Sequence, residues 1–236
     1  MLKLTFHGGA QEVTGACYLL ETDSTRILID CGLFQCPGYC AERNEDAFPF
    51  DPASLNAVII THGHMDHIGR VPKLVRDGFR GKIYSTDPTK DFAAIMLQDS
   101  LGILEKEAQD ENRTLLYTAS DIEKALQVWE GKPYYELFKV GDMHITLHNA
   151  GHILGSAIVE VKAGNIKIAF TGDLGNSPAP LLDPLDNVSD AQFLVIESAY
   201  GDRIHEDMSQ RKIKLERIIE DTIKRGGTLM VPAFSL

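Results

Sequence analysis

The segment HGHMDH, which begins at His62, places three imidazoles and one carboxylate directly after a short apolar run. That run, Ala57 to Thr61, is uncharged and rich in β-branched residues, which predicts a buried strand ending at His62. Alternate side chains of an extended chain point the same way, so His62 and His64 share one target, and Asp66 and His67 form a second cluster beside them. Four such donors would repel one another or stay poorly solvated without a cation between them. The spacing therefore predicts a metal site; the alternative is a polar loop of exposed histidines.

The segment resembles the HxHxDH metal-binding motif of the metallo-β-lactamase superfamily. That superfamily places further ligands at the ends of later strands, and two candidates follow in the right order: His152 after Gly151, and Asp173 after Gly172. His148 competes with His152, but it lies within a strand pattern, where the pleat fixes the side chain and keeps it from a loop-built site. We therefore prefer His152.

The resemblance implies a centre of two zinc ions. One ion is held by His62, His64 and His152, the second by Asp66 and His67, and Asp173 bridges the pair. Asp30, at the end of RILIDCG, matches an earlier position of the superfamily and is expected to bond to ligands or loop amides rather than to metal. The alternative for Asp30 is a turn-forming aspartate.

Further segments narrow the resemblance to the β-CASP branch, which processes nucleic acids and includes RNase J and the cleavage and polyadenylation nuclease. These segments are GGAQEVTGACYLL, ILIDCGLFQ, IMLQDS, LLYTASDIEKAL, AGHILGSAIVEV and VIESAYGDR, and they extend over nearly the whole chain. Glu197 matches the first acidic motif specific to the branch; the alternative is a carboxylate that merely ends a strand. Asp66, Asp30 and Glu197 are the residues that we expect to act in catalysis.

The elements expected along the chain fit an αββα sandwich, in which two sheets pack face to face between outer helices. The first strands are expected at residues 2–6, 17–21, 26–30, 57–61 and 82–85. The second set is expected at residues 135–140, 144–148, 157–161, 167–171 and 193–197. Helices are expected at residues 68–77 and 87–109, and from a capping box of Ser120 and Glu123 to about Trp129.

Residues 209–224 carry an apolar stripe at helical spacing, and the strand-like run TLMVPAFSL follows. In the β-CASP branch a cap domain interrupts the sandwich after the Glu197 motif. We therefore expect residues 1–205 to be a metallo-β-lactamase-like domain and residues 206–236 to begin a cap domain. Two later histidine motifs of the branch do not occur in this sequence. The expectation is the front part of a longer protein, with partial zinc binding and weak turnover, whose last zinc ligand and proton donor lie beyond Leu236.

The resemblance implies a zinc-dependent phosphodiester hydrolase, a ribonuclease that uses a metal-bridging hydroxide as the nucleophile on single-stranded RNA. The net charge of −11 argues against a simple nucleic-acid clamp, but two zinc ions would cancel several charges where the reacting phosphate lies. Two alternatives stay open. One is a metallo-hydrolase of another ester, such as a thioesterase or lactonase of the glyoxalase II type, and the other is a non-catalytic RNA-binding subunit. The resemblance also allows a homodimer.

The sequence contains no apolar span of membrane-crossing length and no signal-peptide pattern at its N-terminus, so we expect a cytoplasmic protein. The four cysteines fit no standard metal-binding spacing, and free thiols are expected. His7 is expected to be an exposed loop histidine, and His144 and His205 surface residues. Arg203 is expected to form a local ion pair with Asp202.

Overall fold

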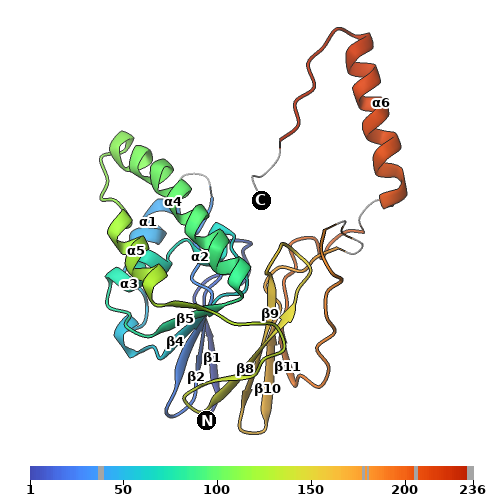
Figure 1. Ribbon diagram of the computed structural model, residues 1–236. Helices are drawn as coiled ribbons and strands as arrows, with labels where there is room; N and C mark the ends of the chain where they lie inside the picture. The colour runs from blue at the N-terminus through green and yellow to red at the C-terminus, as the bar shows by residue number, and fades with distance from the viewer. Residues whose placement is uncertain (37–39, 177–178, 180, 205–206, 233–236) are drawn as a thin grey trace. The chain divides into compact units, whose positions relative to one another are not determined.

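The computed structural model describes the chain except for residues 37–39, 177–178, 180, 205–206 and 233–236. The chain forms two compact units, Met1–Glu197 and Ser198–Leu236. The first unit contains two β-sheets and a group of helices, and the second contains one long helix (Figure 1). The domain boundary predicted between residues 205 and 206 falls outside the described residues and stays a prediction.

The first sheet has six strands in the order β1-β2-β3-β4-β5-β6. Their bounds are β1 (Lys3–Phe6), β2 (Tyr18–Glu21), β3 (Arg26–Ile29), β4 (Ala57–Ile59), β5 (Lys82–Ser85) and β6 (Trp129–Gly131). The first three strands pair antiparallel, whereas β3 to β6 are parallel. The loops after β3 and β4 therefore leave the same edge of this sheet.

The second sheet has five strands in the order β11-β10-β9-β8-β7. Their bounds are β7 (Phe138–Val140), β8 (Met143–Asn149), β9 (Ala157–Ala163), β10 (Ile166–Phe170) and β11 (Phe193–Val195). Strands β10 and β11 pair parallel, and the other neighbours pair antiparallel. The loops after β10 and β11 therefore also leave one common edge.

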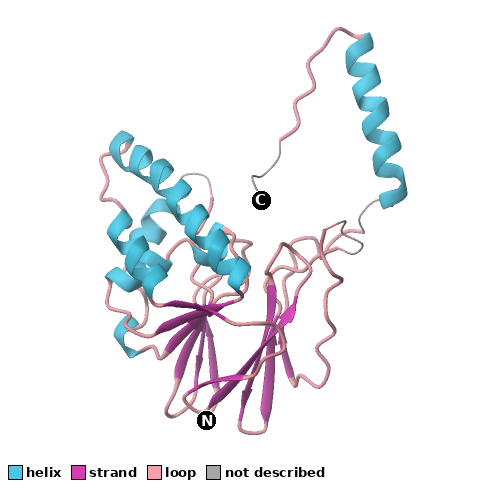
Figure 2. Cartoon of the chain, viewed as in Figure 1, coloured by secondary structure: helices cyan, strands magenta, loops and turns pink. Residues whose placement is uncertain are grey.

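The two sheets pack face to face around a hydrophobic core (Figure 2). Alternate residues of the strands fill this core because successive side chains of a strand point to opposite faces. The first sheet contributes Leu20, Ile27, Ile29 and Ile59, and the second contributes Ile145, Leu147, Val159, Val161 and Phe170. The intervening residues of the first sheet, among them Leu28 and Val58, pack against helical residues on the opposite face. Strands β2, β3 and β4 thus have buried residues on both faces of the sheet.

The helices of the first unit lie on the side of the first sheet that faces away from the second sheet (Figure 2). They are α1 (Cys40–Glu45), α2 (Met65–Ile68), α3 (Val71–Arg76), α4 (Asp87–Asp110) and α5 (Ala119–Gln127), with a 3-10 turn η1 at Pro52–Ser54. On the outer face of the second sheet, Ile158 and Ala169 pack against loop residues that include Leu174 and Val188. The expected α/β sandwich is confirmed, and its helical layer in the described residues lies on the first sheet.

The helix predicted at residues 68–77 is confirmed as α3 with changed ends, and a separate short helix, α2, ends at Ile68 just before it. Helix α3 begins with Val71 and Pro72, a position where the missing N–H of proline is tolerated. Between the two helices the backbone N–H of Arg70 donates to the carbonyl of Cys31, at 2.9 Å, rather than to a helical carbonyl. This contact with a distant loop ends α2, and no local pattern indicates it.

The capping box predicted at Ser120 and Glu123 is wrong. Thr118 and Asp121 form it, with the Thr118 N–H donating to Asp121 Oδ2 at 2.9 Å. Both pairs have the same spacing, so the pattern alone does not choose between them. Trp129, the expected end of the helix, lies in β6, a short strand that the sequence analysis did not predict.

The other predicted strands of the first unit are confirmed with small changes at their ends. The largest change is in the strand expected from residue 135, which begins at Phe138. Tyr135 has a φ of 65°, a left-handed conformation that does not fit an extended strand. The apolar sequence patterns thus predicted the strands. The strand ends depend on turns that these patterns do not specify.

The prediction of free thiols is wrong for two of the four cysteines. Cys36 and Cys40 form a disulfide, with Cα atoms 5.5 Å apart. Cys17 and Cys31 are free and buried, as expected.

The second unit consists of the 3-10 turn η2 (Met208–Gln210), the helix α6 (Arg211–Lys224) and a following segment. The strand expected after the helix is not formed by residues 228–232, and the remaining residues of that run lie outside the described part of the chain. Arg203 pairs with Asp202 at 2.8 Å, as expected. Within the described ranges, no helix combines the length and the apolar character needed to cross a membrane.

Candidate metal centre

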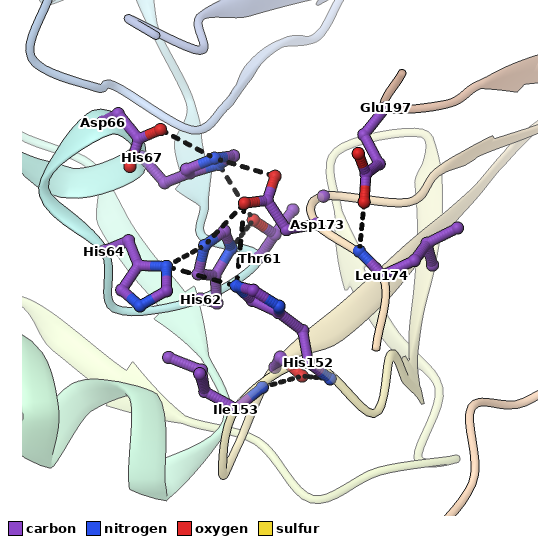
Figure 3. Close-up of polar contacts among 12 residues, drawn as sticks. Thr61, His62, His64, Asp66, His67, His152, Ile153, Asp173, Leu174 and Glu197 are labelled. Atoms are coloured by element: carbon purple, nitrogen blue, oxygen red, sulfur yellow. Dashed lines mark hydrogen bonds and ion pairs between the residues drawn. The ribbon is translucent and has the colours of Figure 1, made fainter. Parts of the chain in front are cut away.

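The predicted metal ligands lie in loops at the ends of strands from both sheets. Residues 62–67 follow β4, and Asp30, the expected supporting residue, follows β3; these parallel neighbours end at the same edge of the first sheet. His152 follows β8 and Asp173 follows β10 in the second sheet. Their side chains converge between the loops (Figure 3). Residues far apart in the sequence therefore meet in one cluster.

The first group of donors consists of His62, His64, His152 and Asp173, whose ligand atoms all lie within 4.8 Å of one another. His64 Nδ1 lies 3.1 Å from His62 Nε2 and 3.2 Å from His152 Nε2. Asp173 Oδ2 lies 3.8 Å from His62 Nε2 and 3.6 Å from His152 Nε2. Around a tetrahedral zinc ion, ligand atoms lie about 3.3 Å apart, since the bonds are ~2.0–2.1 Å long. The chemistry and spacing of this group fit such an ion.

A second group shares Asp173 with the first. His67 Nε2 lies 3.3 Å from Asp173 Oδ1 and 3.8 Å from Asp66 Oδ2. Asp173 thus directs one carboxylate oxygen to each group, which is what a bridging ligand requires (Figure 3). One imidazole and two carboxylates are donors that zinc accepts.

Asp30 and Thr61, both buried, determine which nitrogen of two imidazoles carries the proton. Asp30 accepts hydrogen bonds from the Thr61 N–H and hydroxyl, each at 2.8 Å, and from Nδ1 of His67 at 2.7 Å. Because the Thr61 hydroxyl donates to Asp30, its oxygen accepts from Nδ1 of His62, at 3.1 Å. In both imidazoles Nδ1 therefore carries a proton and Nε2 faces the cluster, which makes Nε2 the nitrogen that a metal ion would take. Asp30 contacts Thr61 and His67, as its expected supporting role demands.

The charge states of the imidazoles differ between the two groups. Burial lowers the pKa of His62 well below its ordinary value, because desolvation disfavours the charged form. Burial also lowers the pKa of the other two imidazoles of the first group. Burial acts in the same direction on His67, but the carboxylates of Asp30 and Asp173 outweigh it and raise the pKa of His67 well above the ordinary value. The first group therefore offers neutral nitrogen donors, and a metal ion in the second group displaces a proton.

The loop that carries His152 is held by its own hydrogen bonds. The N–H groups of His152 and Ile153 both donate to Ser156 Oγ, at 3.0 and 3.2 Å. A Cβ at Gly175 would lie 1.7 Å from the carbonyl oxygen of Gly151, so this loop and the Asp173 loop touch where only glycine fits. The close approach fixes the two loops against each other.

Glu197 follows β11, the parallel neighbour of β10. Its Oε1 accepts a hydrogen bond from the N–H of Leu174 at 3.0 Å, and its own N–H donates to the hydroxyl of Thr171 at 3.2 Å. Leu174 directly follows Asp173 in the chain. Glu197 therefore braces the loop that presents Asp173, and its role in catalysis stays a prediction.

The variant Gly172→Ala is expected to weaken the centre. Gly172 has a φ of 53°, and a Cβ there would lie 2.7 Å from Cβ and Oγ1 of Thr61, so the substitution pushes Thr61 and the adjoining Asp173 apart. Gly164→Ala is the matched control, because Gly164 has a φ of 59° and no atom within 4 Å of an added Cβ.

Both variants should lose about 1 kcal/mol of unfolding free energy, since a side chain disfavours the left-handed conformation. Only Gly172→Ala should lose zinc affinity, measured by competition with a chromogenic chelator. Equal zinc affinities in the two variants would contradict the expected displacement.

The remaining described histidines lie outside the cluster. His148 lies within β8, 3.3 Å from a glutamate of β9, so the structure brings His152 rather than His148 to the other donors. His144 also lies in β8 and is half-buried. His7 is half-buried against the ring of Phe50, with ring centroids 5.1 Å apart, so the expected exposed position is wrong. His205 lies outside the described residues.

The sequence analysis missed two hydroxyl groups that support the ligands. Thr61 directly precedes the HGHMDH segment, and its position next to His62 was the available signal. Ser156 lies four residues after His152, a spacing at which a hydroxyl can bond to a nearby backbone amide.

Two sheets packed face to face, with donor-bearing loops from both sheets meeting in one cluster, define a class of α/β sandwich proteins with a metal site built from loops. The chain belongs to the metallo-beta-lactamase superfamily, whose family model matches residues 10–223.

Relatives of this chain include Ribonuclease TTHA0252 of Thermus thermophilus, which is 35% identical over 100% of this chain and 52% of its own length. Transcription termination factor FttA of Methanocaldococcus jannaschii is 35% identical over 100% of this chain and 37% of its own length. An RNase J-like protein of the same organism is 32% identical over 100% of this chain and 52% of its own length. The chain spans about half, or less, of each relative. Two of these three relatives are named as a ribonuclease and as an RNase J-like protein, which agrees with the resemblance to RNA nucleases.

Proposed function

We propose that the protein is a zinc-dependent phosphodiester hydrolase that cleaves single-stranded RNA. The observation that carries the proposal is the shared carboxylate of Asp173, which joins two groups of metal donors in one cluster. The ribonuclease of Thermus thermophilus that is 35% identical to the chain supports RNA as the substrate. The match covers 52% of that relative's length, so the activity of the whole protein is part of the proposal.

The charges at the site explain why the function needs metal ions. The cluster contains the carboxylates of Asp30, Asp66 and Asp173, and the chain has a net charge of −11. Without cations these carboxylates repel a phosphodiester. When bound, divalent ions act as Lewis acids toward a phosphoryl oxygen and make water acidic enough to serve as a nucleophile near neutral pH. Zinc binding would therefore turn a repulsive site into an attractive one.

The side chains of the cluster have two kinds of role, as metal donors and as partners that orient those donors. The neutral imidazoles of His62, His64 and His152 would hold one cation and Asp66 with His67 the other, and Asp173 would contribute one oxygen to each group. Asp30 holds the proton of His67 on Nδ1 and, through Thr61, that of His62. With cations bound, these hydrogen bonds would keep both Nε2 atoms directed at the metal ions.

The proposal predicts RNA cleavage that depends on metal and on the cluster. The protein, purified at the length at which its host expresses it, should cleave end-labelled single-stranded RNA. A chelator should abolish cleavage, and added zinc should restore it. His64→Ala should lower the rate by at least about 100-fold, more than is usual for residues that only support a ligand. His144→Ala, which changes a histidine of β8 outside the cluster, should leave the rate unchanged.

Three outcomes would contradict the proposal in different ways. Cleavage that persists in chelator or in His64→Ala would exclude the metal cluster as the site. Hydrolysis of a thioester or lactone without RNA cleavage would indicate an esterase of the glyoxalase II type. Retention of zinc and RNA without cleavage would indicate a non-catalytic RNA-binding subunit. The homodimer and the cytoplasmic location stay predictions.

A further inference from the structure

We infer that the first turn of α4, which contributes no candidate ligand, positions His152 against the other imidazoles through the hydroxyls of Thr86 and Thr89. The inference rests on the metal centre of the proposed function and concerns residues that lie 63 and 66 positions before His152 in the chain. Three contacts lead from the threonines to the backbone of His152.

The first contact is a buried triangle of three oxygen atoms. The carbonyl oxygen of Gly155 lies 2.6 Å from Thr86 Oγ1 and 2.9 Å from Thr89 Oγ1, and the two hydroxyl oxygens lie 3.0 Å apart. Each hydroxyl has one hydrogen, and only one hydrogen can lie between the two threonines. The carbonyl therefore accepts at least one hydrogen bond in every arrangement. Thr86 is 2% exposed and Thr89 is 0% exposed, so water does not replace these donors.

The second and third contacts fix the peptide that follows this carbonyl. The carbonyl of Gly155 and the N–H of Ser156 belong to one peptide group, and that N–H donates to the carbonyl of Ile153 at 3.0 Å. The peptide is thus held at both ends, by α4 and by its own loop. Ser156 Oγ in turn accepts from the N–H of His152 at 3.0 Å. A rotation of this peptide would move Ser156 and with it the backbone of His152.

The start of α4 also lies against the loop that carries the other two imidazoles, through Phe92 in its second turn. A Cβ at Gly155 would lie 2.8 Å from the nitrogen of Thr89, and a Cβ at Gly63 would lie 3.1 Å from Cβ of Phe92. Gly63 separates the two imidazoles of the HxH pair. The helix start is therefore a common support for the loops that carry all three imidazoles of the first donor group.

Thr89→Val is the variant that isolates this role. Valine keeps the branched shape of threonine and removes only the hydroxyl. Thr86 is less suitable, because its hydroxyl also accepts from the N–H of Thr89 at the start of the helix. Thr89→Ser keeps the hydroxyl and should restore the wild-type behaviour. Thr118→Val, which removes the hydroxyl at the start of α5, controls for a general loss of stability.

The test measures metal binding and not turnover. Purified chains are titrated with Co²⁺, and the ligand-field absorption bands report the geometry around the ion. Thr89→Val should bind Co²⁺ about 10–100-fold more weakly than wild type, the loss typical of residues that orient a ligand, and should show shifted bands. Thr89→Ser and Thr118→Val should match wild type in both affinity and spectrum, with thermal unfolding showing that every variant is folded.

The outcomes separate this inference from the proposed function. Wild-type affinity and spectrum in Thr89→Val would overturn the inference and leave the metal centre intact. An equal loss of affinity in Thr118→Val would also overturn it, because the loss would then follow stability. A wild-type chain that does not bind Co²⁺ would instead contradict the metal centre itself.

Discussion

Asp173→Asn is expected to lower the zinc affinity of the chain by more than about 100-fold, beyond the loss typical of residues that only support a ligand. Asp173 Oδ2 faces His62 and His152, and Oδ1 faces His67, so one carboxylate serves both donor groups. Asparagine keeps the size of the side chain but lacks the negative charge and turns an amide NH₂ toward one of the groups. Both groups should therefore be weakened by a single substitution.

The measurement is the number of zinc ions retained per chain after dialysis against a weak chelator, with RNA cleavage followed in parallel. Asp186→Asn is a suitable control, because Asp186 is also half-buried and its carboxylate accepts from the N–H of Asn149 at 2.7 Å, outside the cluster. Loss of zinc in both variants, or in neither, would contradict a role for the Asp173 carboxylate as a ligand shared by the two donor groups.

Asp30→Asn is expected to have the largest effect on folding stability, with the unfolding free energy falling by about 3 kcal/mol. Asp30 is 0% exposed, and its two oxygens accept three hydrogen bonds from Thr61 and His67. Asparagine must place an NH₂ group against one of these donors, and it removes one of the two carboxylates that pair with the buried His67. The backbone adds little to the effect, because Asp30 has a φ of 58°, a conformation that asparagine adopts as readily as aspartate.

Urea unfolding in the presence of a chelator measures this change apart from any metal. Asp51→Asn provides the control, since Asp51 is an exposed residue whose carboxylate accepts from the N–H of Ala53. Its substitution should change the unfolding free energy by less than about 1 kcal/mol. Equal stabilities for the two variants would contradict the view that Asp30 organises the buried part of the centre.

The residues that form the cluster were predictable from the sequence because their signals are local. The donors of HGHMDH lie within six residues, and His152 and Asp173 each follow a glycine at the end of a strand. The alternating apolar pattern likewise predicted the strands that bring them together. The resemblance to a known superfamily then gave the order in which the ligands occur along the chain.

The supporting residues were not predictable because their contacts join distant parts of the chain. The hydroxyls of Thr86 and Thr89 reach a carbonyl that lies 69 and 66 residues away. Arg70 ends a helix by bonding to Cys31, on a different strand loop. The error at the start of α5 has a similar origin, since two capping patterns overlap there and only Asp121 of the two candidate acids is buried against the protein. Tertiary packing decided each of these cases.

Elemental analysis after equilibrium dialysis against zinc, on the wild-type chain and on His62→Ala side by side, is the most direct test of the metal centre. His62 is 0% exposed and contributes to the first donor group. Its imidazole therefore does not serve as a solvated surface group. The wild-type chain should retain at least one zinc ion, and His62→Ala should retain far less. A wild-type chain without stoichiometric zinc, or equal zinc in both chains, would contradict a metal centre at this cluster.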